Sequence, residues 1–324
     1  MGEVNAMVYS NEELKKYYKG AYSFKEKDGW LQSFQYTEAQ MEYFKRTEIY
    51  WYERSFATTG KTIEARTSAT EISFDYKIIW QGSLDTFELF VNKEPVEAYY
   101  IENLESEGRL TFHIPEGEGA NRITIYLPLD ATVVIRGLTA DAPLEPIGNR
   151  KKVLWMGDSI TQGYGPLRSA YNYVNVANRI LDWDVINQGI GGYIYDKGSV
   201  MPMEGYTPDL IMVALGTNQY MSGDLRPVRE FYERLREVYD SSIPAIVISP
   251  VWINDFEHNG QKEDFIRFCE GIKCIAAGTP NTRVIDGFEL VPHGSEYYID
   301  DLHPNLEGAK TYGKKLGEIL WKER

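Results

Sequence analysis

The spacing of hydrophobic residues changes halfway along the chain, and this change constrains the fold more than any other feature of the sequence. Between about Thr47 and Thr139, apolar residues recur at every second position, and turns rich in Gly, Asn and Asp separate the runs. Examples are Ile72, Phe74, Tyr76 and Ile78, Phe87, Leu89 and Val91, Leu110, Phe112 and Ile114, and Ile123, Ile125 and Leu127. Such alternation is typical of strands with one buried face. This half therefore predicts an antiparallel β-sandwich of about six or seven short strands.

Past a Pro- and Gly-containing segment at 141–148, the pattern changes to short apolar runs that do not alternate. These runs lie at 153–156, 185–186, 210–215, 245–248 and 284–285, and segments with helical spacing lie at about 169–181, 224–240, 262–277 and 305–320. Apolar strands that alternate with helices are typical of a parallel sheet covered on both faces. We therefore predict an α/β fold, with a three-layer flavodoxin-like domain at 148–324 preceded by a jelly-roll-like antiparallel β-sandwich at 1–147.

The chain is strongly acidic. Its 324 residues include 34 Lys plus Arg against 48 Asp plus Glu, which gives a net charge of −14. Because such a surface repels phosphate backbones and anionic lipids, we expect neither nucleic acid nor a membrane as partner, and a neutral or sugar-like substrate fits better. The N-terminus lacks the apolar core of a secretory signal, and the apolar runs are far shorter than the roughly 18 residues of a membrane span. We expect a cytoplasmic protein, with a removed leader as the alternative. The oligomeric state stays open.

The two cysteines, Cys269 and Cys274, lie five positions apart in a segment with helical spacing. On a helix their side chains would point about 140° apart, which is too divergent for a disulfide or a shared metal ion. We interpret them as packed thiols in a reducing compartment.

In open α/β sheets, ligands bind beyond the carboxyl ends of the strands, so the residues that follow each predicted strand are candidates for chemistry. The four segments are Gly157-Asp158-Ser159-Ile160-Thr161, Asn187-Gln188-Gly189-Ile190-Gly191-Gly192, Gly216-Thr217-Asn218-Gln219 and Asp300-Asp301-Leu302-His303-Pro304. The chain has no Walker A loop, dinucleotide fingerprint, Gly-x-Ser-x-Gly elbow or His-Glu-x-x-His zinc motif.

Together the four segments resemble the sequence blocks of the SGNH, or GDSL, hydrolases. Gly157-Asp158-Ser159 is similar to the first block, Gly192 to the glycine of the second, Asn218 to the asparagine of the third, and Asp300 with His303 to the Asp-x-x-His of the last. The resemblance covers about 150–324. It implies that Ser159 is the nucleophile, His303 the base and Asp300 its orienting partner. It also implies an oxyanion hole made by the amides of Ser159 and Gly192 and the side chain of Asn218.

The geometry of a flavodoxin-like sheet favours the same residues independently. In the strand order 2-1-3-4-5, the first three strands are neighbours about 4.8 Å apart. Ser159, Gly192 and Asn218 should therefore converge at one edge, where three donors can hold a developing oxyanion. Asp300 and His303 are close enough in sequence to share one turn, in which the carboxylate would fix the imidazole tautomer. Gln219 stands where many similar proteins have aspartate, and we expect this difference to alter the local loop more than the activity.

We therefore expect a serine esterase that uses neither a metal nor an organic cofactor. The N-terminal half, including Tyr36-Thr37-Glu38-Ala39-Gln40, resembles the sandwich that precedes the SGNH domain in some carbohydrate esterases. This resemblance favours acetyl or other short-chain acyl esters, carried by a small molecule or an oligosaccharide. The alternatives are a lysophospholipase or thioesterase that acts on longer acyl chains, and a catalytically silent glycan-binding protein.

Four other residues are weaker candidates. We interpret His113, His258 and His293 as structural or surface residues, and Trp252 as either a stacking platform for a sugar ring or a packed wall of the site.

Overall fold

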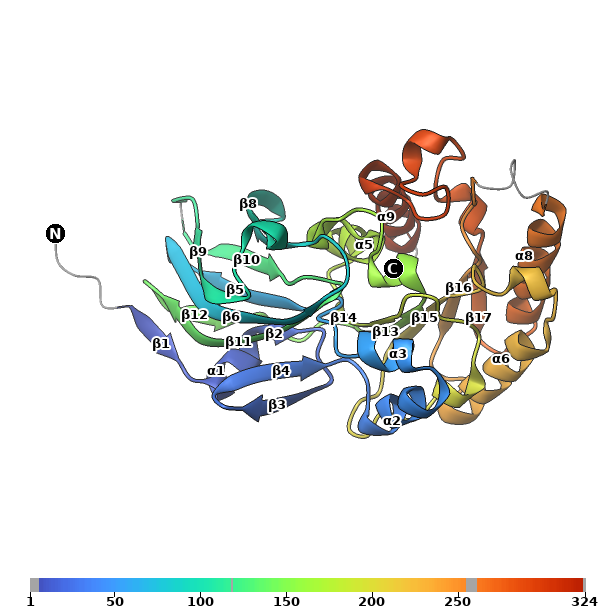
Figure 1. Cartoon of the computed structure of the whole chain (residues 1–324), viewed down its shortest axis with the longest axis horizontal. Coiled ribbons are helices and arrows are strands. Elements are labelled where there is room, and N and C mark those ends of the chain that lie inside the picture. The colour runs from blue at the N-terminus through green and yellow to red at the C-terminus, as the bar shows by residue number, and fades with distance from the viewer. Residues whose placement is uncertain (1–5, 118, 255–260, 323–324) are drawn as a thin grey trace.

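The N-terminal half of the chain contains two packed antiparallel sheets. The computed structural model describes residues 6–117, 119–254 and 261–322. The strands of these sheets are β1 (Met7–Tyr9), β2 (Tyr18–Lys19), β3 (Ser23–Lys27), β4 (Trp30–Phe34), β5 (Thr62–Thr67), β6 (Glu71–Gln81), β7 (Thr86–Val91), β8 (Glu94–Tyr100), β9 (Glu107–His113), β10 (Asn121–Tyr126), β11 (Ala131–Ala140) and β12 (Leu144–Pro146). One sheet has the order β3-β4-β11-β6-β9 with β1 beside β11, and the other has the order β12-β5-β10-β7-β8 with β2 beside β5. Both lie on the left in Figure 1.

The predicted sandwich is confirmed, and its inward-facing residues were predicted correctly. Ile72 and Phe74 of one sheet and Ile123 and Ile125 of the other are fully buried in a single hydrophobic cluster. The two sheets extend beyond the span in which the sequence alternates. The span 47–139 does hold β5 to β11, but β1 to β4 and β12 lie outside it, and residues 49–54 form a helix. These additional strands have two to five residues each, too few to show a period of two in the sequence.

The C-terminal half contains a parallel sheet of five strands. These are β13 (Lys152–Gly157), β14 (Asp184–Gly189), β15 (Leu210–Ala214), β16 (Ala245–Ile248) and β17 (Thr282–Ile285). Their order is β14-β13-β15-β16-β17, which is the predicted flavodoxin-like order. The α/β fold class is therefore confirmed.

Helices cover both faces of the parallel sheet (Figure 1). Along β13, Val153 and Trp155 belong to the core on the face covered by α5 (Tyr173–Leu181) and α9 (Leu306–Trp321). Leu154 and Met156 belong to the core on the opposite face, which α6 (Arg226–Val238) and α8 (Lys262–Ala277) cover. The strands are buried on both sides, which explains why their sequences do not alternate.

Two helices from the N-terminal half also pack on this second face. They are α2 (Glu38–Thr47) and α3 (Ile49–Arg54), which follow β4 in the chain. Phe44 of α2 and Trp51 of α3 make edge-to-face contacts with Tyr193, with ring centroids 5.9 and 4.9 Å apart. One hydrophobic core therefore crosses residue 147, and the division into 1–147 and 148–324 stays a prediction.

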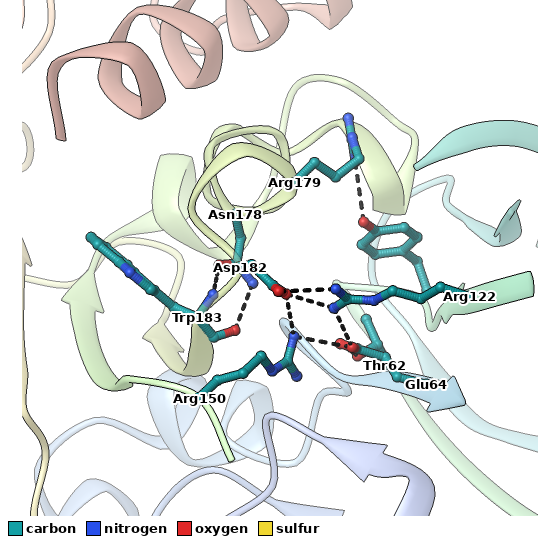
Figure 2. A network of polar contacts seen from close by, with 9 residues as sticks. Thr62, Glu64, Arg122, Arg150, Asn178, Arg179, Asp182 and Trp183 are labelled. Carbon is teal, nitrogen blue, oxygen red and sulfur yellow. Dashed lines mark hydrogen bonds and ion pairs between the residues drawn. The ribbon is translucent and has the colours of Figure 1, made fainter. Parts of the chain in front are cut away.

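A network of charged side chains joins the sandwich to the α/β half (Figure 2). Arg122 of β10 lies 2.6 Å from Asp182, which follows α5, and 3.2 Å from Glu64 of β5. Arg150 lies 3.0 Å from Glu64 and 3.1 Å from Asp182. Hydrogen bonds from the two arginines lower the pKa of Asp182 to about 2, although its partial burial opposes the shift. We call these four residues the interface network.

Within the described ranges, no helix is long and apolar enough to cross a membrane. The same ranges hold no group of three or more His, Cys, Asp or Glu side chains that could bind a metal ion. Both cysteines are free thiols; Cys269 is buried, as predicted, whereas Cys274 is exposed, so the prediction of a packed thiol was wrong for Cys274.

Candidate active site

Ser159 stands at the turn between β13 and the short helix α4 (Ser159–Gln162). Asp158 caps this helix, because its buried carboxylate accepts a hydrogen bond from the Ile160 amide at 3.0 Å. Burial raises the pKa of Asp158 to about 6, although hydrogen bonds such as the one from Ile160 oppose the rise. A side chain at Gly157 would overlap Thr161, so glycine is required for the strand to turn this tightly into the helix. The turn leaves Ser159 half-buried, with its hydroxyl at the carboxyl edge of the sheet.

The imidazole of His303 connects Ser159 to Asp300. Ser159 Oγ lies 2.7 Å from His303 Nε2, and His303 Nδ1 lies 2.8 and 3.0 Å from the two carboxylate oxygens of Asp300. Hydrogen bonds from the backbone and ring of His303 lower the pKa of Asp300, although partial burial acts in the opposite direction. Asp300 is therefore ionised at neutral pH and can only accept hydrogen bonds. This places the imidazole proton on Nδ1 and leaves Nε2 free to take the proton of the serine.

The loop before α9 holds His303 in this position through local hydrogen bonds. Asp300 Oδ1 also accepts the backbone amides of Leu302 and His303, at 3.2 and 2.8 Å. Asp301, at a positive φ of 62°, accepts a hydrogen bond from Asn254 Nδ2 at 2.9 Å. The His303 side chain is only 13% exposed, so its ring has little freedom to move away from Ser159.

Gly192 and Asn218 follow β14 and β15, the two strands that flank β13. Gly192 is exposed and has a φ of +71°, and nothing lies within 4 Å of where a Cβ would be. Asn218 Nδ2 donates to the carbonyl oxygen of Tyr193 at 2.9 Å, so the asparagine contacts the loop that carries Gly192. The fold thus brings Ser159, Gly192 and Asn218 to one edge of the sheet, as the sequence predicted.

Gln219 also contacts this loop. Its Oε1 accepts the Tyr195 amide at 2.6 Å and its Nε2 donates to the Tyr195 carbonyl oxygen at 3.4 Å. The glutamine therefore supports the local loop geometry, which is where we expected its effect.

His113, His293 and Trp252 lie outside this hydrogen-bonded group. His113 is an exposed residue of β9 that lies 3.5 Å from Glu97. The ring of His293 stacks on Trp252 with centroids 4.3 Å apart, so a ring face of Trp252 is already covered. Trp252 also packs edge-to-face on Phe288, which fits the packing interpretation better than the sugar platform. His258 lies outside the described residues.

Sequence reasoning missed three residues that support the site. The Tyr164 ring packs edge-to-face on the His303 ring with centroids 4.6 Å apart. Gly165, at a φ of +119°, lies so close to the Pro304 carbonyl oxygen that a side chain there would overlap it. Gln162 contacts both Asp130 and Gly191. The closely spaced Gly163 and Gly165 were a visible signal for a tight turn, but no local pattern marked Tyr164 or Gln162.

The parallel sheet and the side chains at its edge define this part of the chain as an SGNH-type α/β domain. Its family follows from a direct match: residues 155–311 fit the model of the GDSL-like Lipase/Acylhydrolase family. The chain therefore contains a domain of this family of ester hydrolases, preceded by antiparallel sheets. A search of curated proteins found no match to the chain.

Solved structures with the same fold span both halves. The salicylyl-acyltransferase SsfX3 from a tetracycline biosynthetic pathway has a TM-score of 0.75 at 18% identity, covering 99% of each chain. A protein described as a GDSL-like lipase from Bacteroides ovatus has a TM-score of 0.77 at 16% identity, covering 98% of each chain. A family two carbohydrate esterase from Clostridium thermocellum, solved with cellohexaose, has a TM-score of 0.61 at 16% identity and covers 82% of this chain and 93% of its own. At these identities the likeness shows the fold.

Proposed function

We propose that the protein is a serine esterase in which Ser159, His303 and Asp300 act as a catalytic triad. The observation that carries the proposal is the continuous hydrogen-bonded chain from Ser159 Oγ through His303 to Asp300, with heavy-atom distances of 2.7 and 2.8 Å. Serine is a weak nucleophile at its ordinary pKa, and an adjacent base within hydrogen-bond distance activates it.

In this proposal, Ser159 Oγ attacks the carbonyl carbon of the ester while its proton moves to His303 Nε2. The carbonyl oxygen becomes an oxyanion, which the amides of Ser159 and Gly192 and the side chain of Asn218 bind. His303 then gives the proton to the leaving alcohol, and the acyl group remains on Ser159. Water repeats the sequence on the acyl-enzyme, with His303 again as the base, and releases the acid.

We further propose that the substrate is an acetyl or other short-chain ester on a carbohydrate. The fold of the carbohydrate esterase that was solved with cellohexaose supports this proposal, because it resembles the present fold over most of both chains. The net charge of −14 favours a neutral substrate over an anionic one.

A fluorophosphonate probe tests the mechanism. We expect it to label the native protein and Ser241→Ala, in which an exposed serine outside the site is replaced, but not Ser159→Ala. Labelling of Ser159→Ala at the native rate would overturn the assignment of the nucleophile. No labelling of the native protein would favour the glycan-binding alternative.

A series of p-nitrophenyl esters from acetate to laurate tests the acyl preference. We expect kcat/KM to be highest for acetate and to fall as the chain lengthens. A maximum at long chains would replace the short-acyl proposal with a lysophospholipase or thioesterase. Release of acetate from acetylated xylo- or cello-oligosaccharides tests the alcohol portion in the same way.

A further inference from the structure

The loop that carries Gly192 is held by side chains on both sides of that glycine. We call residues 190–195 the oxyanion loop. Tyr193 is held by Asn218, as described above. On the other side, the Gly191 amide donates to Gln162 Oε1 at 2.7 Å, in a buried hydrogen bond. These two contacts hold the residues immediately before and after Gly192, and the orientation of its N–H depends on both.

Gln162 is bound at both ends of its amide group. Its Nε2 donates to Asp130 Oδ1 at 2.9 Å, and its Oε1 accepts from Gly191. Its side chain is only 3% exposed, so water is not available to replace either partner. A carboxylate accepts hydrogen bonds but does not donate them. Asp130 therefore requires the NH₂ end of the amide on its side, and this directs the carbonyl end toward Gly191.

Asp130 belongs to the sandwich, at the turn between β10 and β11. Its backbone amide donates to Asp85 Oδ2 at 3.1 Å, which fixes the turn. Its carboxylate lies 3.6 Å from Arg54 Nε, and the Arg54 guanidinium stacks on Tyr50 and Trp80 at 4.2 Å from each ring. Burial raises the pKa of the Asp130 carboxyl, and the Arg54 cation opposes that rise. The acceptor that orients Gln162 is thus supplied and held by the N-terminal half.

We propose that Gln162 is a positioning residue for the Gly192 amide and that Asp130 of the sandwich sets the direction of the Gln162 side chain. The sandwich then contributes to stabilisation of the oxyanion through the contact from Asp130 to Gln162 to Gly191. This inference rests on the proposed function, because it takes Gly192 as an oxyanion donor.

The expected effect is on kcat, because an oxyanion donor acts on the transition state more than on the bound ester. Removal of one such donor costs about 10²- to 10³-fold in rate. Displacement of Gly192 leaves the donor present but misplaced, so we expect a loss of about 10- to 100-fold in kcat. KM should stay within about threefold of the native value, since the displaced donor contributes little to binding of the ester before it reacts.

Exchanging the amide of residue 162 and the carboxylate of residue 130 tests whether the hydrogen bond between them orients the side chain at 162. Gln162→Glu keeps an acceptor for Gly191 but places a second carboxylate against Asp130, so we expect it to show the full loss in kcat. Adding Asp130→Asn to that variant supplies an amide donor to the new carboxylate. We expect the double variant to recover to within about fivefold of native kcat, a coupling that a double-mutant cycle measures directly.

The interface network provides a matched control. Asp182→Asn removes a carboxylate that lies between the sandwich and the α/β half and pairs with Arg122 and Arg150, but not with the oxyanion loop. We expect it to lower the unfolding temperature without a change in kcat. Should Gln162→Glu fail to fold, Gln162→Met removes both hydrogen bonds without adding a charge, and the same loss in kcat is expected.

The outcomes separate this inference from the proposed function. Native kcat in Ser159→Ala would overturn the proposed function itself. If Ser159→Ala is inactive, native kcat in Gln162→Glu and Gln162→Met would overturn the positioning role. Failure of Asp130→Asn to restore Gln162→Glu would overturn the role of Asp130 in orienting Gln162. An equal loss of kcat in Asp182→Asn would overturn the specific contact through Gln162, because any weakened contact between the two halves would then lower kcat.

Discussion

Replacing Asp300 by Asn should inactivate the enzyme by trapping the wrong tautomer of His303. In the native site, Asp300 Oδ1 accepts the backbone amides of Leu302 and His303, and Oδ2 lies 2.8 Å from His303 Nδ1. An asparagine side chain has a single acceptor. If its oxygen stays on the two backbone amides, its NH₂ group faces Nδ1.

The alternative orientation of that asparagine is less favourable. Turning its oxygen toward Nδ1 would set the NH₂ group against two backbone N–H donors and lose two hydrogen bonds, each contributing about 0.5 to 1.5 kcal/mol. A neutral imidazole carries its proton on either nitrogen. We therefore expect Nδ1 to become the acceptor and Nε2 to carry the proton, so that Nε2 no longer accepts the proton of Ser159.

The expected loss in kcat for Asp300→Asn is about 10³- to 10⁴-fold, because a histidine in the wrong tautomer is not a base for the serine. This corresponds to about 4 to 5.5 kcal/mol in the activation free energy. The assay is hydrolysis of p-nitrophenyl acetate, with thermal unfolding to confirm the fold.

Asp301→Asn is the matched control for this experiment. It removes the same charge from the neighbouring residue, while an asparagine oxygen can still accept the hydrogen bond from Asn254. We expect its kcat to stay within about threefold of native, in line with an exchange that leaves the hydrogen bond in place. A tenth or more of native kcat in Asp300→Asn, or an equal loss in Asp301→Asn, would refute the tautomer argument.

Two further results are expected. Asn218→Ala removes a proposed oxyanion donor and should lower kcat about 10²- to 10³-fold with little change in KM, as steady-state kinetics would show; an unchanged kcat would exclude Asn218 from the oxyanion hole. Burial raises the pKa of Asp85 to about 7, although three backbone amides oppose the rise. Because the folded protein then holds a proton that the unfolded chain releases above about pH 4, the free energy of unfolding should fall as pH rises from about 4 to 7. Asp85→Asn should reduce this slope by up to about 1.4 kcal/mol per pH unit in urea unfolding; an unaltered slope would contradict the assignment.

The sequence was most informative where short-range patterns determine the structure. Each parallel strand is a local apolar run, so its position could be predicted without knowing its neighbours. Once the order of strands was assumed, the placement of Ser159, Gly192 and Asn218 at one edge followed from topology. The pairing of Asp300 with His303 depends on a single local turn, and it too was visible in the spacing.

The parts that could not be predicted depend on contacts between distant segments. The buried side of α2 is complementary to Tyr193, which lies about 150 positions later in the chain. The contact from Asp130 to Gln162 joins a turn of one sheet to a helix of the other half. Neither contact produces a periodic signal in its own segment, because the sequence of a segment does not show which distant residue a buried aromatic ring or amide group contacts.

The shared core also limits how this chain can be divided. Phe44 and Trp51 lie before most of the sandwich in sequence, yet they fill the core of the α/β half against Tyr193. Dividing the chain at 141–148 would therefore separate these aromatic residues from the surface that they cover. An α/β half without residues 1–147 would leave Tyr193 uncovered, so the two halves are not interchangeable modules.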